Sequence, residues 1–170
     1  MSIAILPGSY DPITLGHLDI ITRAAAQYDE IVVAVMNNAA KHYTFDMGER
    51  AEMARLATVN IPGVRVVADD GMLVDLFDRL GATVIVKGVR NGKDLAYEQE
   101  MAAYNLAKKP RAKTVFLDAD PTLLAVSSTR VREMLREGRV PEGLLPSAVI
   151  GYLAELGVLQ NPERRSHEQI

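Results

Sequence analysis

The residues best suited to chemistry lie near the start of the chain, between Gly8 and His17. Gly8 and Ser9 follow the apolar run Ile3–Leu6, and a glycine and a hydroxyl at the end of a strand let a phosphate approach the backbone closely. His17 begins an apolar-periodic stretch, and the exposed N–H groups and dipole at a helix start favour anions. The order of strand, glycine loop and helix therefore predicts a site for nucleotide phosphates, although a lone histidine at a helix start is more often a cap or a packing residue.

Cations, glycines and hydroxyls also follow other predicted strands. Lys41 comes after the second apolar run, the stretch Lys87–Arg90 after the fourth and the stretch Ser127–Thr129 after the fifth. Because ligands bind beyond the carboxyl ends of the strands in such sheets, we expect these residues to converge. Arginine can grip a phosphate with two donors, and a helix start offers free N–H groups. This set suits a polyphosphate, although a solvated basic loop, a helix N-cap or an exposed lysine would be the plainer interpretation of each stretch alone.

Three of these stretches resemble a known family. The segment from Pro7 to His17 is similar to the opening P-G-S-[YF]-D-P-I-T-x-G-H of phosphopantetheine adenylyltransferases, and it contains the T-x-G-H signature of the nucleotidylyltransferase superfamily. The segment from Lys87 to Glu98 resembles their [KR]-G-[LIV]-R…D-F-E-Y-E pattern, with Leu95 and Ala96 in place of the usual Phe and Glu. The run from Leu123 to Thr129 resembles a family segment that usually ends S-S-S. The resemblance covers the chain from about residue 3 to residue 156.

The resemblance implies transfer of the adenylyl group of ATP to 4′-phosphopantetheine, a step of coenzyme A biosynthesis. The acceptor phosphate would attack in line, without a covalent enzyme intermediate, and give dephospho-coenzyme A and pyrophosphate. Mg²⁺ would accompany ATP, with phosphates and water as most of its ligands, and the chain would form a homo-oligomer, a hexamer in this family. The run Ser127–Arg132 is also similar to the S-S-T-x-[IV]-R segment of nicotinate and nicotinamide mononucleotide adenylyltransferases. A pyridine mononucleotide acceptor, or a non-catalytic nucleotide sensor on the same fold, therefore remains an alternative.

The resemblance also implies roles for single residues. His17 would stabilise the α-phosphate, and with Lys41 and Arg90 it makes up the predicted catalytic set. We predict no metal-binding residue. The residues predicted to bind the acceptor are Ser9, Lys41, Leu73, which would line the pantetheine arm, and Lys87. The residues predicted to bind the nucleotide are Ser9, Tyr10, His17, Gly88, Val89, Arg90, Glu98, Leu123, Leu124, Ala125, Val126, Ser127, Ser128 and Thr129.

Short apolar runs alternate with helical patterns along the chain, which predicts a doubly wound, Rossmann-like α/β fold with a parallel five-stranded sheet and helices on both faces. The predicted strands are Ile3–Leu6, Ile31–Met36, Val64–Ala68, Thr83–Val86 and Lys113–Leu117. The predicted helices are Leu15–Tyr28, one that opens at Asp46 with a capping box to Glu49, Met72–Leu80, one capped by Asp94 that ends before Pro110, Ser128–Glu137 and Ser147–Leu156.

Composition narrows the class of protein. A chain of 170 residues fits one domain, which we place at residues 1–160, followed by a polar tail at 161–170 that we expect to be loosely ordered. The net charge of −3 and the pI of about 5.6 argue against a general nucleic-acid binder. The chain has no cysteine, which excludes disulfides and thiolate metal sites. With no secretion-signal pattern and no apolar stretch of about 20 residues, we expect a cytoplasmic protein without membrane partners.

Overall fold

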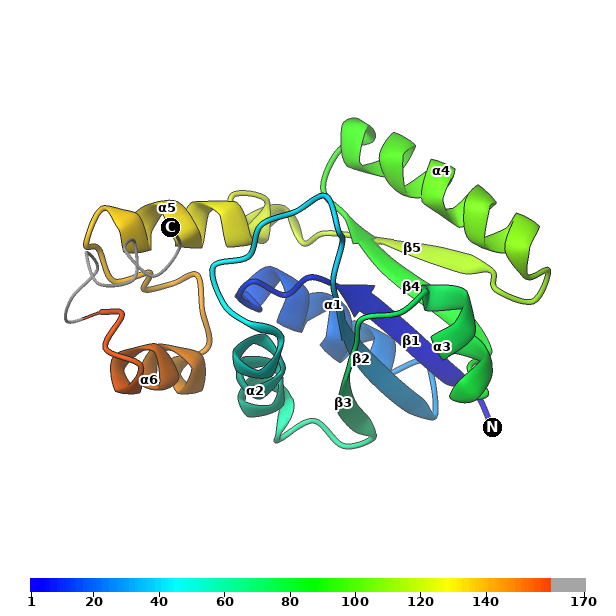
Figure 1. The fold of residues 1–170 in the computed structure, drawn as a ribbon, viewed down its shortest axis with the longest axis horizontal. Coiled ribbons are helices and arrows are strands. Elements are labelled where there is room, and N and C mark those ends of the chain that lie inside the picture. The colour runs from blue at the N-terminus through cyan, green and yellow to red at the C-terminus, as the bar shows by residue number, and fades with distance from the viewer. Residues whose placement is uncertain (160–170) are drawn as a thin grey trace.

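Five apolar segments form one parallel sheet in the computed structural model, which describes residues 1–159. The strand order is β3-β2-β1-β4-β5, and every neighbouring pair is parallel. The sheet and its helices confirm the predicted doubly wound α/β fold (Figure 1). The predicted tail, residues 161–170, lies outside the described residues. The strands are β1 (Ile3–Gly8), β2 (Glu30–Met36), β3 (Val64–Asp69), β4 (Val84–Val89) and β5 (Thr114–Asp118).

Helices cover both faces of the sheet because its central strands are apolar on both sides. In β1, Ala4 and Leu6 point into a larger core with α1, α2, α5 and α6, whereas Ile5 points into a smaller core with α3. Burying one such branched side chain contributes about 1.5–3 kcal/mol. The helices are α1 (Leu15–Ala25), α2 (Met47–Thr58), α3 (Leu73–Arg79), α4 (Gly92–Lys108), α5 (Ser128–Arg136) and α6 (Ser147–Glu155), with a short 3₁₀ helix at Pro121–Leu123 that the sequence did not lead us to expect.

Two strands extend further toward the site than their sequences predict. We expected the first strand to end at Leu6 and the fourth at Val86, but β1 continues to Gly8 and β4 to Val89. The added residues of β1 pair with β2, and those of β4 pair with β5. Lys87 therefore lies within a strand and not in the loop that follows it. Pairing with neighbouring strands outweighs the low strand propensity of glycine and charged residues.

The ends of three helices can be compared with what the sequence predicts. The capping box of α2 is present, since Asp46 accepts a hydrogen bond from the Glu49 N–H at 2.7 Å. For α4 the prediction of Asp94 as the cap was wrong: Asn91 caps the helix and accepts a hydrogen bond from the Asp94 N–H at 2.9 Å. Helix α1 ends at Ala25, three residues before the predicted Tyr28, where the chain turns toward β2.

The strand order reverses between β1 and β4, and this switch point is where open α/β sheets bind ligands. Helices α5 and α6 extend the molecule beyond the carboxyl ends of the strands, so that α5 begins beside the switch point (Figure 1). Among residues 1–159, no helix is long and apolar enough to cross a membrane.

Candidate active site

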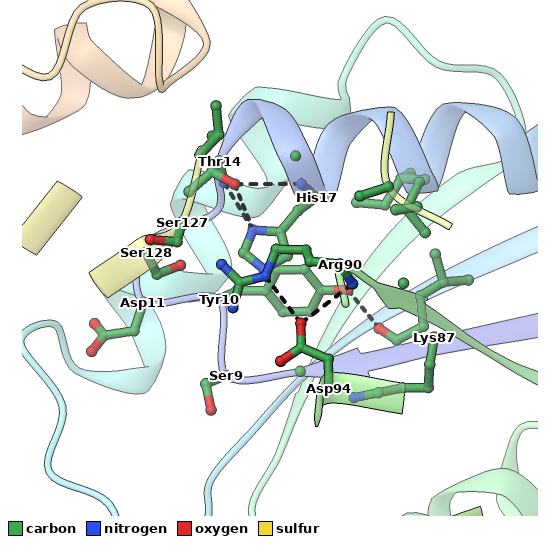
Figure 2. A pocket seen from close by; sticks show the side chains of 18 of the residues that line it. Ser9, Tyr10, Asp11, Thr14, His17, Lys87, Arg90, Asp94, Ser127 and Ser128 are labelled. Atoms are coloured by element: carbon green, nitrogen blue, oxygen red, sulfur yellow. Dashed lines mark hydrogen bonds and ion pairs between the residues drawn. The ribbon is translucent and has the colours of Figure 1, made fainter. Parts of the chain in front are cut away.

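A cavity of about 360 Å³ opens at the switch point, at the carboxyl ends of β1 and β4. Four separate segments line it: the end of β1 with the loop into α1 and the first turns of that helix, the loop after β2, the end of β4 with the first turns of α4, and the segment from β5 into the start of α5 (Figure 2). The structure therefore brings most of the predicted site residues together. Those that line the cavity are Ser9, Tyr10, His17, Lys41, Lys87, Gly88, Arg90, Glu98, Leu123, Val126, Ser127, Ser128 and Thr129.

Four predicted site residues are not among those that line the cavity. Leu73 is the first residue of α3 and packs against the smaller core. Val89 ends β4 with a buried side chain. Leu124 and Ala125 are exposed on the segment before α5. Contact of these four residues with a ligand stays a prediction.

The imidazole of His17 is held by the residue that caps its own helix. The backbone N–H of Thr14 donates a hydrogen bond to His17 Nδ1 at 3.0 Å, and Thr14 Oγ1 accepts one from the His17 N–H at 3.4 Å. A backbone N–H can only donate, so Nδ1 must be the acceptor and the neutral ring carries its proton on Nε2. His17 is thus the N3 residue of a capping box, in the place that Glu or Gln usually takes.

The surroundings of His17 keep the ring neutral. Burial, followed by the positive charges of Lys87 and Arg90, lowers its pKa to about 4. At neutral pH the ring therefore offers a hydrogen-bond donor without a full positive charge. Such a donor can meet a phosphate oxygen as negative charge develops there.

The ring of Tyr10 packs against the imidazole of His17. Its ring centroid lies 4.9 Å from that of His17, and its hydroxyl donates a hydrogen bond to the Leu6 carbonyl at 2.8 Å. Its φ of 48° is left-handed, which is uncommon for a tyrosine and is held here by the buried ring. A Cβ on Gly8 would stand 3.0 Å from this ring, so the position favours glycine.

Carboxylates of α4 hold two of the cations that line the cavity. Glu98 lies 3.4 Å from Lys87. Asp94 lies 3.1 Å from Arg90 (Figure 2). Asp94 and Glu98 are four residues apart and share one face of the helix. The cations are therefore oriented before any ligand binds, and a phosphate would replace or share these partners. Lys41 also lines the cavity, on the loop after β2.

The hydroxyls at the start of α5 already have partners. Ser127 caps the helix and accepts a hydrogen bond from the Arg130 N–H at 3.0 Å, which confirms the N-cap interpretation. Ser128 Oγ donates to the carbonyl of Pro12 at 2.7 Å and so joins α5 to the loop after β1. What the helix start offers an anion is its backbone, because the first N–H groups of a helix have no intrahelical acceptor.

Three charged residues that line the cavity were not predicted as site residues from the sequence, namely Asp11, Asp94 and Arg132. Arg132 donates a hydrogen bond to the Asp11 carbonyl at 2.8 Å, across 121 residues of sequence. The buried Asp11 carboxylate accepts hydrogen bonds from the N–H groups of Thr44 and Phe45. Asp11 and Asp94 lie inside stretches that resemble the family, and Arg132 ends the run that resembles nicotinate and nicotinamide mononucleotide adenylyltransferases, but these patterns did not reveal the contacts.

Two features of its surroundings favour glycine at position 88. We expected it to let a phosphate approach the backbone, and it does line the cavity. A Cβ there would also stand 2.8 Å from Cγ1 of Ile20 on α1, closer than packing allows. The glycine therefore lets α1, which carries His17, pack directly on β4.

The carboxylates that line the cavity do not form a metal centre. Within the part of the chain that the structure describes, no group of three or more His, Cys, Asp or Glu side chains could hold a metal ion. The carboxylates of Asp11, Asp94 and Glu98 are each engaged with an N–H group or a cation. This donor set does not fit a resident Mg²⁺.

Comparison with known proteins identifies the family of this chain. Residues 5–134 match the model of the cytidylyltransferase-like family. The chain is 49% identical to a phosphopantetheine adenylyltransferase of Symbiobacterium thermophilum, over 89% of this chain and 94% of that protein. It is 41% identical to the enzyme of that name from Rhizorhabdus wittichii, over 88% and 91% of the two chains. It is 40% identical to that of Levilactobacillus brevis, over 88% and 92%.

The motif that carries His17, the strand order and the residues gathered at the switch point all agree with these matches. The chain therefore belongs to the phosphopantetheine adenylyltransferases, within the cytidylyltransferase-like family.

Proposed function

We propose that this protein transfers the adenylyl group of ATP to 4′-phosphopantetheine, which gives dephospho-coenzyme A and pyrophosphate. The observation that carries the proposal is one cavity in which a neutral imidazole with its proton on Nε2 stands beside Lys87 and Arg90. Family membership supplies the two substrates. A site that binds two anionic reactants needs cations, and a site that stabilises developing charge needs a fixed donor.

The reaction would be a single in-line displacement. An oxygen of the acceptor phosphate forms a bond to the α-phosphorus of ATP, and the bond from that phosphorus to the oxygen bridging the β-phosphorus breaks. The bonding electron pair leaves with pyrophosphate. The acceptor phosphate is already an anionic nucleophile, so no base has to remove a proton from it. Catalysis then consists of positioning and charge stabilisation.

The chain's residues would divide these tasks by position. His17 would donate its Nε2 proton in a hydrogen bond to an α-phosphate oxygen, most strongly in the transition state. Ser9, Lys41 and Lys87 would hold the acceptor phosphate. Arg90 and the start of α5 would hold the β- and γ-phosphates, because the guanidinium and the backbone N–H groups both suit phosphate oxygens.

Magnesium would enter as a partner of ATP. The carboxylates that line the cavity are engaged with backbone N–H groups and cations, so they do not suit a protein-held ion. We expect Mg²⁺ to be held by phosphate oxygens and water.

The acceptor can be tested directly. The protein is incubated with ATP and Mg²⁺ and either 4′-phosphopantetheine or a pyridine mononucleotide, and release of pyrophosphate is measured. The proposal predicts turnover with phosphopantetheine. Turnover with the pyridine mononucleotide alone would identify the other acceptor, and ATP binding without turnover with any acceptor would favour a nucleotide sensor.

We also propose a homohexamer in the cytoplasm, on the basis of family resemblance. Several large apolar side chains of α4 and β5 are exposed in the single chain, which supports assembly. Sedimentation analysis should then give six times the chain mass of 18.6 kDa. The exposed residues are Tyr97, Met101, Tyr104, Leu106 and Val115.

A further inference from the structure

Arg50 of α2 is an arginine whose side chain is fully buried next to the cavity. Its Nε donates a hydrogen bond to the Phe45 carbonyl at 3.0 Å. Its Nη1 donates to the Ser9 carbonyl at 2.8 Å and to the Met36 carbonyl at 3.3 Å, and its Nη2 donates to the Asn37 side-chain oxygen. One guanidinium thus meets four oxygens from three segments of the chain.

Three of the four oxygens lie at the two ends of the segment that carries Lys41. Met36 ends β2, Asn37 begins the loop that follows and Phe45 lies directly before the N-cap of α2, so the hydrogen bonds of Arg50 hold both ends of this loop. The Ser9 carbonyl belongs to the loop after β1. Side chains of a helix lean toward its N-terminus, which lets a residue in the first turn of α2 reach back over both loops.

Tyr43 completes the same arrangement. Its ring lies under the guanidinium, 4.0 Å from the Arg50 Cζ to the ring centroid. Its hydroxyl accepts a hydrogen bond from the Asn38 N–H at 2.6 Å and lies 3.4 Å from Ser9 Oγ. The loop after β2 therefore contacts the side chain of Ser9, whereas Arg50 of α2 bonds to the backbone carbonyl of Ser9.

A buried guanidinium is costly, and it is retained where its planar fork makes several bonds at once. A lysine would keep the charge, but its single nitrogen could not reach all four oxygens. Arg50 itself is not among the residues that line the cavity, whereas Ser9 and Lys41 are. Any effect of Arg50 on a ligand must therefore act through the two loops.

We propose that Arg50 is a positioning residue that sets the place of Ser9 and Lys41 relative to each other, and so builds the part of the cavity that takes the acceptor phosphate. This inference rests on the proposed function. The hydrogen bonds and the ring contact described for Arg50 all go to the two loops, and none involves the segments that carry Arg90 or Ser127. Its loss should weaken binding of the acceptor more than binding of ATP.

The test compares Arg50→Lys and Tyr43→Phe with the wild type and with Arg55→Lys. Arg55 lies on the same helix, but it is exposed and pairs only with Glu52, at 3.7 Å, in the described structure. KM for 4′-phosphopantetheine and KM for ATP are measured separately from pyrophosphate release, and circular dichroism reports the fold. Tyr43→Phe keeps the ring under the guanidinium and removes only the hydroxyl, so it remains informative if Arg50→Lys does not fold.

We expect Arg50→Lys to raise the KM for the acceptor about 10-fold or more, because it removes buried hydrogen bonds, and Tyr43→Phe to raise it roughly 3- to 10-fold, because it removes hydrogen bonds that are only partly shielded from water. The KM for ATP should change less than about 2-fold in both, and Arg55→Lys should match the wild type. An unchanged acceptor KM in folded Arg50→Lys, or in Tyr43→Phe where Arg50→Lys does not fold, would overturn the inference, and so would an equal rise of both KM values. A wild type and an Arg55→Lys variant without turnover would instead overturn the proposed function.

Discussion

The orientation of the His17 ring decides what this residue can do. Its Nδ1 accepts a hydrogen bond from the Thr14 backbone, which leaves Nε2 with the only ring proton. Burial, Lys87 and Arg90 keep the ring uncharged at neutral pH. A neutral donor of fixed direction costs no reorganisation when charge develops on a phosphate oxygen. His17 is therefore suited to stabilise a transition state and not to transfer a proton.

This role predicts the effect of removing the donor. His17→Ala should lower kcat by about 10²–10³, as is typical for loss of one preorganised donor, while the protein stays folded. His17→Gln should lose less, because its amide can still donate near the position of Nε2. Pyrophosphate release and circular dichroism measure the two properties. Near-normal kcat in His17→Ala would refute the catalytic role.

The lowered pKa of His17 also predicts how stability depends on pH. The pKa is about 4 in the folded chain and near 6.5 in an unfolded chain. Above pH 6.5 the ring is neutral in both the folded and the unfolded state, and the contribution of the lowered pKa to the free energy of unfolding is fully present. As the pH falls from 6.5 to 4, the ring takes up a proton in the unfolded state but not yet in the folded state. Proton uptake therefore stabilises the unfolded state, and the contribution is lost progressively until the loss is complete below pH 4.

Urea denaturation at pH 7.5 and pH 4.5 tests this dependence. The wild type should lose roughly 2 kcal/mol more unfolding free energy than His17→Gln between these pH values, because the variant lacks the imidazole. Equal losses in the two proteins would show that the ring does not titrate with a lowered pKa.

The packing of α1 on β4 determines where the His17 helix sits. Ile20 lies one turn after His17 and meets β4 at Gly88, where no side chain intervenes. The same strand carries Lys87, so one strand–helix contact sets the distance between the imidazole and a cation. A residue without a side chain thus contributes to the geometry of the site.

Adding one methyl group at this contact should disturb both stability and activity. Gly88→Ala would place a Cβ 2.8 Å from Ile20 Cγ1, and such overpacking typically costs about 1–3 kcal/mol. We expect a lower melting temperature and a lower kcat. Gly92→Ala is the matched control, because a Cβ there meets nothing within 4 Å at the start of α4. Equal behaviour of the two variants would contradict the packing argument.

Across the whole molecule, the site is assembled from segments that span the chain from β1 to α5. Arg132 bonds to the Asp11 carbonyl and Ser128 to the Pro12 carbonyl, so α5 is hydrogen-bonded to the loop between β1 and α1. Ligands that touch all of these segments should stabilise the fold as a unit. A ligand at 100 times its Kd adds about 2.7 kcal/mol to the unfolding free energy.

An experiment with EDTA distinguishes a metal ion that binds together with ATP from one that the protein holds by itself. EDTA should abolish pyrophosphate release, because the polyphosphate loses its counter-ion. It should leave the melting temperature of the protein without ATP unchanged, because the carboxylates of the cavity are already engaged. Calorimetry with and without EDTA measures this. A lower melting temperature on adding EDTA to the free protein would indicate a protein-held metal.

The sequence by itself determined the order of strands and helices, the place of the site at the strand ends and most of the residues that line it. These features depend on short-range patterns, such as apolar runs, the capping box at Asp46 and the motif that ends in His17. Residues a few positions apart interact directly within a strand, a turn or a helix, so their spacing alone carries the information.

Only the tertiary structure decided which distant groups meet. The hydrogen bond from Arg50 to Ser9 spans 41 residues and that from Arg132 to Asp11 spans 121. Strand pairing likewise extended β4 past the predicted end at Val86, and α1 packing explained Gly88. Such contacts exist only once the whole sheet and its helices have packed. Their partners are therefore set by the folded topology and not by neighbours in the chain.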